Sequence, residues 1–210
     1  MKYQHFFWDF DGTLFDTYAR ITRAIQKALK DLGIEATYEE IFPVAKLSIG
    51  KCLKHFTEPL GIERDVYQAA YHAHAEDEPY DTILLYPGAR EMLEEICRRG
   101  GKNYIYTHRG PSAREVIVLK GMEHLFADYV TSENGFPSKP APNALQYLME
   151  KHGLKKEECI MIGDRGIDVE SGLNAGMSGA FIDLDHRFPD YKVPYCADDF
   201  AQLQQMLLED

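Results

Sequence analysis

The sequence predicts an α/β fold with an open parallel sheet, helices on both faces of that sheet, and a small helical insert near the N-terminus. From residue 84 onward, short apolar runs alternate with segments of helical periodicity, whereas residues 16–83 show helical periodicity and no convincing strand. Alternating strands and helices pair in parallel through right-handed crossovers. The 210 residues, 45% of them hydrophobic, suffice for a core domain with a smaller appendage.

The first strand is expected at Phe6–Trp8, where three consecutive large apolar residues indicate a strand buried on both faces. The run ends at Asp9 and Asp11, and Gly12 follows directly. These two acids could be turn or cap residues. Burying carboxylates beside an apolar run costs free energy unless a cation or hydrogen bonds compensate, so a functional site is the alternative. This motif alone leaves both interpretations open.

The insert begins with an amphipathic helix at Thr17–Leu32, in which apolar residues recur at helical spacing and Gly33 marks the end. Leu84–Gly88 predicts a turn that leads back into the core. Between these segments, three further helical pieces are expected, at residues 41–44, 49–56 and 64–76.

The remaining segments alternate between strand and helix. The expected strands are Asn103–Thr107, Tyr129–Thr131, Cys159–Ile162 and Ser178–Ile182. The expected helices are Ala89–Arg99, Ser112–Lys120, Pro142–His152, Gly166–Ala175 and Phe200–Leu208, the last preceded by Asp198 and Asp199 as cap residues. Polar residues then gather where strands end: Asp9 and Asp11 after the first, Thr107 at the second, Asp164 after the fourth.

Four motifs therefore follow one another along the chain: Asp9-Phe10-Asp11-Gly12-Thr13, then Thr107, then Ser138-Lys139-Pro140, then Gly163-Asp164 with Asp168 four residues on. Together they resemble the haloacid dehalogenase superfamily, whose phosphatases carry these motifs in this order, and the resemblance covers essentially the whole chain. It implies a Rossmann-like core made of residues 1–15 and 84–210. The helical insert, residues 16–83, is similar to the family's type 1 cap domain, which can close over the site and exclude water.

The resemblance implies a magnesium-dependent phosphatase of the phosphoglycolate phosphatase-like branch, acting on a small phosphorylated metabolite through an aspartyl-phosphate. Asp9 would be the nucleophile, because a carboxylate is already ionised at neutral pH, and Asp11 the general acid and base. Thr107 and Lys139 would bind and stabilise the transferring phosphoryl group. The metal ligands implied are Asp9, the carbonyl of Asp11 and Asp164, with Asp168 holding a metal-bound water.

Several interpretations remain open on the sequence. His108 and Arg109 are further candidates for substrate binding, although Arg109 could equally be a solvated loop residue. Lys51 could face the site or the solvent. The sugar-phosphate mutase branch resembles this chain in size and cap, but it uses a histidine in the first cap helix, which Thr17–Leu32 lacks. A binding or regulatory protein without turnover is the third possibility, and the intact set of motifs argues against it.

Composition excludes some partners. The net charge of −11 argues against a nucleic-acid backbone as the main partner. Neither a bilayer-spanning run nor a signal segment is present, so a cytoplasmic protein without a membrane partner is expected. The four cysteines are widely spaced and predict reduced thiols. His72 and His74 point to different faces of a helix, which disfavours a metal pair there.

Overall fold

The computed structural model describes residues 1–75, 77–186, 191 and 193–209. The chain divides into two compact units: a core unit, Met1–Phe15 with Leu85–Asp210, and a helical unit, Asp16–Leu84. The helical unit ends one residue beyond the insert expected from the sequence. Within the described part of the chain, no helix combines the length and apolar character that crossing a membrane requires.

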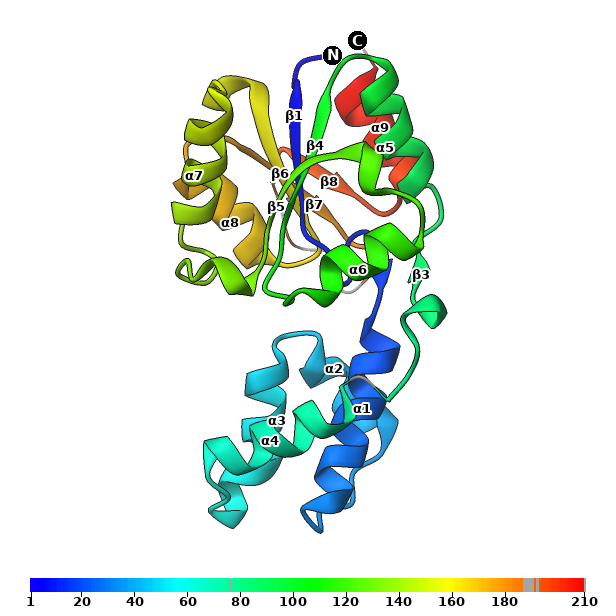
Figure 1. Cartoon of the computed structure of the whole chain (residues 1–210), viewed down its shortest axis with the longest axis vertical. Helices are drawn as coiled ribbons and strands as arrows, with labels where there is room; N and C mark the ends of the chain where they lie inside the picture. Colours follow the sequence, from blue (N-terminus) through cyan, green and yellow to red (C-terminus); the bar gives the residue numbers. More distant parts are fainter. Residues whose placement is uncertain (76, 187–190, 192, 210) are drawn as a thin grey trace. The chain divides into compact units, whose positions relative to one another are not determined.

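The core unit is built on a six-stranded sheet whose neighbouring strands all pair in parallel, in the order β5-β4-β1-β6-β7-β8. Helices α7 and α8 cover one face of the sheet, and α5 and α9 cover the other (Figure 1). The predicted α/β class is therefore confirmed. The strands are β1 His5–Trp8, β4 Lys102–Tyr106, β5 Phe126–Val130, β6 Cys159–Gly163, β7 Ser178–Ile182 and β8 Tyr195–Ala197. The α-helices are α5 Ala89–Arg98, α6 Ser112–Leu119, α7 Asn143–His152, α8 Gly166–Asn174 and α9 Phe200–Leu208; 3₁₀ turns span Glu123–Leu125, Ser132–Asn134 and Lys156–Glu158.

Strand β1 lies at the centre of this sheet because its side chains can be buried on both faces. Phe6, Phe7 and Trp8 are fully buried, and the strand pairs with β4 on one side and β6 on the other. The one polar atom of the Trp8 side chain, Nε1, donates to Asn103 Oδ1 on β4 at 3.0 Å. The ends of β1, β4 and β6 therefore meet at one edge of the sheet, where the polar motifs follow them.

The structure differs from the sequence prediction in four respects, which concern β5, β8, the β2–β3 pair and the start of α9. Strand β5 begins at Phe126, three residues before the predicted start, because Asp128 can enter it with its carboxylate paired to Lys151 at 2.8 Å. Strand β8 was not predicted, since its three residues are too few to show a pattern. Two short segments, β2 Phe15–Asp16 and β3 Leu84–Leu85, pair with each other where the sequence predicted only a turn at Leu84–Gly88.

The fourth correction concerns the start of α9. Asp199 caps this helix as predicted, because its carboxylate accepts from Gln202 N at 2.7 Å. Asp198 is not a cap: its backbone N–H donates to Gln202 Oε1, and its carboxylate lies 3.8 Å from His186 Nδ1. Only one side chain can occupy the cap position of a helix, so the second acid turns elsewhere.

The helical unit buries one apolar face of each of its helices. Ile21, Ile25 and Leu29 of α1 pack with Ile41 of α2 and Leu53 of α3. Its α-helices are α1 Tyr18–Asp31, α2 Tyr38–Ala45, α3 Ile49–Thr57 and α4 Arg64–His74, and 3₁₀ turns span Glu58–Leu60 and Tyr80–Thr82. Residue 76, the predicted end of the last helix, lies outside the described residues.

The two histidines of α4 have different partners. The His74 ring lies between two carboxylates, with Nε2 at 2.6 Å from Asp31 Oδ2 and Nδ1 at 2.9 Å from Asp77 Oδ2. These hydrogen bonds raise the pKa of His74. His74 therefore links α4 to α1, while His72 contacts the ring of Tyr71 instead.

Candidate active site

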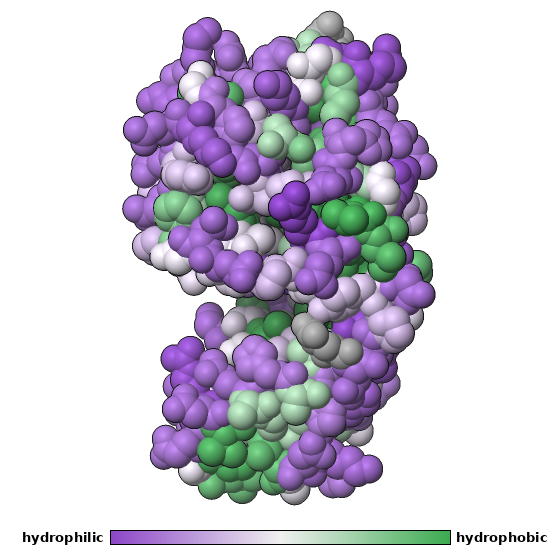
Figure 2. All heavy atoms as spheres, viewed as in Figure 1, coloured by the Kyte–Doolittle hydropathy of each residue, from purple (hydrophilic) through white to green (hydrophobic). Residues whose placement is uncertain are grey.

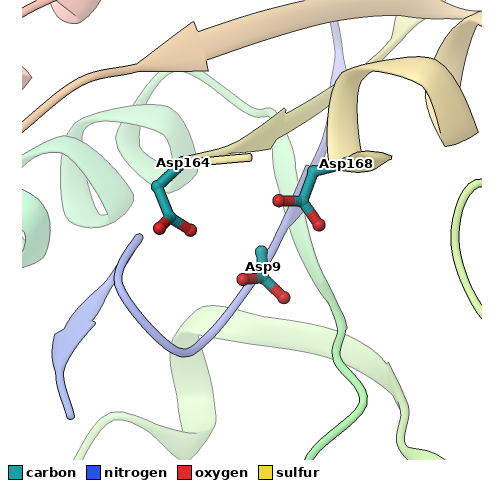
Figure 3. A group of neighbouring side chains, drawn as sticks. All are labelled: Asp9, Asp164 and Asp168. Carbon is teal, nitrogen blue, oxygen red and sulfur yellow. The ribbon is translucent and has the colours of Figure 1, made fainter. Parts of the chain in front are cut away.

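Three carboxylates meet at the C-terminal edge of the sheet. Asp9 follows β1, Asp164 follows β6, and Asp168 lies in the first turn of α8. One oxygen from each lies within 4.8 Å of the others, and the three carboxylates point toward one another (Figure 3). Among the residues that the structure describes, this is the one group of three or more acidic, histidine or cysteine side chains close enough to share a metal ion. The structure thus brings together three of the four predicted metal-site residues.

The close approach of Asp164 and Asp168 depends on the glycine that ends β6. A Cβ atom on Gly163 would lie 2.3 Å from the Cβ of Asp168, so only glycine lets the start of α8 pack this closely. Asp168 Oδ2 in turn accepts from the backbone N of Arg165 at 3.1 Å, which fixes the carboxylate at the start of the helix. The Gly-Asp motif and the later aspartate therefore act as one structural unit.

Lys139 is the cation inside this group. Its Nζ donates to Asp9 Oδ1 at 2.6 Å and to Asp168 Oδ1 at 2.8 Å, and its side chain is fully buried. Burial opposes the charged form of this lysine, but Asp168 and Asp9 outweigh that effect and raise the pKa of Lys139. Lys139 therefore joins the first and fourth motifs through two buried ion pairs.

The remaining negative charge in the group fits a divalent cation. Burial, followed by repulsion from Asp9 and Asp168, raises the pKa of Asp164 to about 7. Asp9 Oδ2 is buried, and none of the described residues donates a hydrogen bond to it. Three carboxylates close together, with Lys139 as the only lysine paired to them among the described residues, are an oxygen donor set of the kind that Mg²⁺ prefers. The residues present therefore fit the metal that the sequence predicted.

Asp164 is held by Thr13, a residue for which no role was predicted. The Thr13 hydroxyl donates to Asp164 Oδ1 at 3.0 Å and accepts from the backbone N of Asp164 at 3.0 Å. Thr13 is fully buried and belongs to the first motif. The sequence shows a threonine in the first motif, but it does not show that this threonine contacts Asp164 of the fourth motif.

Asp11 is not part of the three-carboxylate group and pairs with Arg109. Arg109 Nη1 donates to Asp11 Oδ1 at 2.8 Å, and its Nε donates to Ser112 Oγ at 2.9 Å. Gly12, at φ +82°, allows the chain to turn directly after Asp11. The Arg109 side chain is only 13% exposed, so it is not a solvated loop arginine in this structure. A metal-ligating role for the Asp11 carbonyl remains a prediction.

Thr107 and His108 follow β4 and face the same edge. Thr107 is buried, and its hydroxyl oxygen accepts from the backbone N of Arg109 at 3.0 Å. His108 Nε2 accepts from the backbone N of Lys139 at 2.9 Å, and burial, followed by Lys139 and Arg165, lowers the pKa of His108 to about 4. His108 is therefore neutral at pH 7, with its proton on Nδ1, and it supports the loop that carries Lys139.

The chain as a whole carries an excess of negative charge. The visible surface is mainly hydrophilic (Figure 2), and the chain has a net charge of −11. An anionic ligand would therefore depend on local cations, here Lys139 and Arg109, and on any bound metal. Lys51, the other basic candidate from the sequence, is an exposed residue of α3 in the helical unit.

Several known proteins are similar to this chain. A phosphoglycolate phosphatase of Vibrio parahaemolyticus is 31% identical over 185 residues, which cover 80% of this chain and 78% of that protein. A 5′-nucleotidase of Pseudomonas aeruginosa is 30% identical over 99% of this chain and 96% of its own. Among solved structures, a hydrolase of Streptococcus pneumoniae is 30% identical, with a TM-score of 0.63 over 85% of this chain and 92% of its own.

A second solved structure is similar in fold. It is a subfamily IA hydrolase of the haloacid dehalogenase superfamily from Geobacter sulfurreducens, 18% identical, with a TM-score of 0.72 over 97% of this chain and 94% of its own. The family model described as haloacid dehalogenase-like hydrolase matches residues 6–182, a range that begins in β1 and ends with β7 and so includes all four motifs. The chain therefore belongs to the haloacid dehalogenase-like hydrolase family.

Proposed function

We propose that this protein is a magnesium-dependent phosphatase that hydrolyses a small phosphomonoester through an aspartyl-phosphate on Asp9. The observation that carries the proposal is the state of the Asp9 carboxylate, in which Lys139 fixes Oδ1 while Oδ2 is buried and without a donor among the described residues. Such an oxygen is ready to form a bond to phosphorus. The relatives named phosphoglycolate phosphatase and 5′-nucleotidase support a small phosphate ester as the substrate class.

A cation is needed because the site is crowded with negative charge. Two unit charges of the same sign about 4 Å apart repel by about 4 kcal/mol at an effective dielectric of about 20. Asp9, Asp164 and the Asp11 carbonyl would hold Mg²⁺, with Asp168 on a bound water. When bound, the ion would neutralise charge on the carboxylates and on the phosphate oxygens.

The chain's own residues divide the reaction between them. Asp9 Oδ2 attacks phosphorus, the bond from phosphorus to the ester oxygen breaks, and Asp11 gives its proton to the leaving oxygen. Lys139 and the Thr107 hydroxyl stabilise the phosphoryl oxygens. Water then attacks phosphorus with its proton taken by Asp11, which releases inorganic phosphate and restores the Asp9 carboxylate. Asp11 enters the first step protonated, and the 2.8 Å ion pair with Arg109 orients its ionised form, which takes the proton of the attacking water.

The helical unit would serve as the cap domain of this enzyme. Its first helix, α1 Tyr18–Asp31, contains no histidine, so the group that the mutase branch uses to favour transfer to a sugar is missing from it. Asp11 is then left to activate water. Hydrolysis is therefore the expected outcome for a phosphoryl group on Asp9.

Phosphate release from a panel of esters tests the proposal. With Mg²⁺ present, we expect stoichiometric inorganic phosphate from at least one small ester among phosphoglycolate, sugar phosphates and nucleoside monophosphates, and little from a folded phosphoprotein. An Asp9→Asn preparation purified in parallel excludes a contaminating phosphatase. Rapid interconversion of hexose 1- and 6-phosphates with negligible phosphate release would instead establish a mutase.

A further inference from the structure

The ammonium group of Lys139 has a third neighbour besides its two carboxylates. Nζ lies 4.6 Å from the ring centroid of Tyr106, the last residue of β4. Lys139 Nζ therefore has Asp9 Oδ1, Asp168 Oδ1 and an aromatic face around it. An ammonium group carries three N–H donors, and two of them are used by the carboxylates.

We propose that Tyr106 is a positioning residue for Lys139, whose ring face holds the ammonium group where it contacts Asp9. The proposal rests on the function proposed above, because it assigns Tyr106 to the same reaction. The negative face of an aromatic ring attracts a cation without carrying a formal charge. A third carboxylate in this place would add to the repulsion of a phosphate dianion, whereas the ring does not.

The surroundings of Tyr106 show that its ring, and not its hydroxyl, makes the contact that matters. The residue is 2% exposed, and it is held in the sheet opposite Val130 of β5. Its hydroxyl is buried, and no described residue forms a hydrogen bond with it. A small cavity of about 220 Å³ adjoins Tyr106, Thr107 and His108. A hydroxyl without a partner costs free energy, so it does not explain why a large aromatic residue stands here.

The same short segment also fixes the other end of Lys139. His108, two residues after Tyr106, accepts from the backbone N of Lys139 at 2.9 Å. The end of β4 therefore supports the lysine at its backbone through His108 and at its ammonium group through Tyr106. The arrangement holds Nζ against Asp9 while a substrate binds and leaves.

Two substitutions at position 106 distinguish the effect of the aromatic ring on kcat from the effect of the hydroxyl. Tyr106→Phe keeps the ring, so we expect kcat to stay within about twofold of wild type. Tyr106→Leu removes it, and kcat should fall by roughly tenfold or more, with KM changed little. Fluorinated phenylalanines at position 106 keep the shape and weaken the ring face, so log kcat should fall with each added fluorine while the unfolding midpoint stays constant.

The matched control is Tyr104→Leu. Tyr104 lies two residues earlier on β4, is fully buried with an unpartnered hydroxyl, and stacks on Phe7 at 4.7 Å. This variant should lose stability as Tyr106→Leu does, yet keep the kcat of the folded enzyme. Equal kcat in Tyr106→Leu and Tyr106→Phe, or a flat fluorine series, would overturn the proposal.

A readout that needs no turnover separates this proposal from the proposed function. In protein labelled with ¹³C at lysine Cε, the ring should shift the Lys139 signal upfield in wild type and Tyr106→Phe, but not in Tyr106→Leu. An absent shift in wild type would refute the contact itself. A clear shift in an enzyme that releases no phosphate from any ester would refute the proposed function and leave the contact standing.

Discussion

Replacing Asp9 with asparagine is expected to lower kcat by at least roughly 10³-fold while the fold persists. The neutral amide oxygen is a poor nucleophile, so the bond to phosphorus does not form. The substitution is nearly isosteric, and Lys139 keeps its second partner, Asp168, at 2.8 Å. Steady-state kinetics on the preferred ester, with circular dichroism of the same samples, measure both effects.

The matched control is Asp128→Asn. Asp128 is also an acid with a lysine partner, since Lys151 Nζ lies 2.8 Å from its carboxylate, but it belongs to the edge strand β5 away from the three-carboxylate group. This variant should retain the turnover of the wild type. If Asp9→Asn turned over substrate as Asp128→Asn does, Asp9 would not be the nucleophile.

Removal of divalent cations is expected to abolish turnover, and added Mg²⁺ to restore it. The physical reason is that burial, followed by repulsion from Asp9 and Asp168, raises the pKa of Asp164 to about 7, and a divalent cation would offset the negative charge gathered there. Mg²⁺ should also raise the unfolding temperature of the wild type, since a ligand at 100 times its Kd contributes about 2.7 kcal/mol.

Two matched variants test whether the stabilisation by Mg²⁺ arises at the three-carboxylate group. Asp164→Asn should lose most of the stabilisation by Mg²⁺, whereas Asp128→Asn should keep it. Full turnover in excess chelator, or an equal Mg²⁺-dependent shift in both variants, would contradict a metal site at the three-carboxylate group.

The fold could be predicted from the sequence where one residue pattern dominated. The unbroken apolar run Phe6–Trp8 predicted strand β1, because such a short run is typical of a strand buried on both faces. Helix α9 was predicted with its observed bounds, Phe200–Leu208. Strand β8 and the start of β5 could not be predicted in this way. Asp128 is acceptable inside β5 only because Lys151 and His152 reach its carboxylate from α7, and a sequence pattern does not show such tertiary partners.

The candidate site also contains residues whose placement could be predicted from the sequence and residues whose placement could not. Asp9 and Asp164 follow strands of one parallel sheet, so their meeting was predictable, whereas Lys139 was expected beside them only from the family resemblance. The partner of Asp11 was not, because a side-chain rotamer and an ion pair with Arg109 decide it. The contact between Tyr106 and Lys139 could not be predicted for another reason. A tyrosine inside a predicted strand indicates that the ring is buried, but it does not indicate that a cation lies over the ring.

The proposed mechanism depends on an intermediate in which Asp9 carries the phosphoryl group, and trapping this intermediate is the most direct test of it. The enzyme should be mixed with Mg²⁺ and an ester labelled in its phosphate, quenched in acid within the first turnover, digested and mapped by mass spectrometry. We expect the label on the peptide that contains Asp9, and none in Asp9→Asn. Label on another residue, or none on the protein during active turnover, would contradict the account.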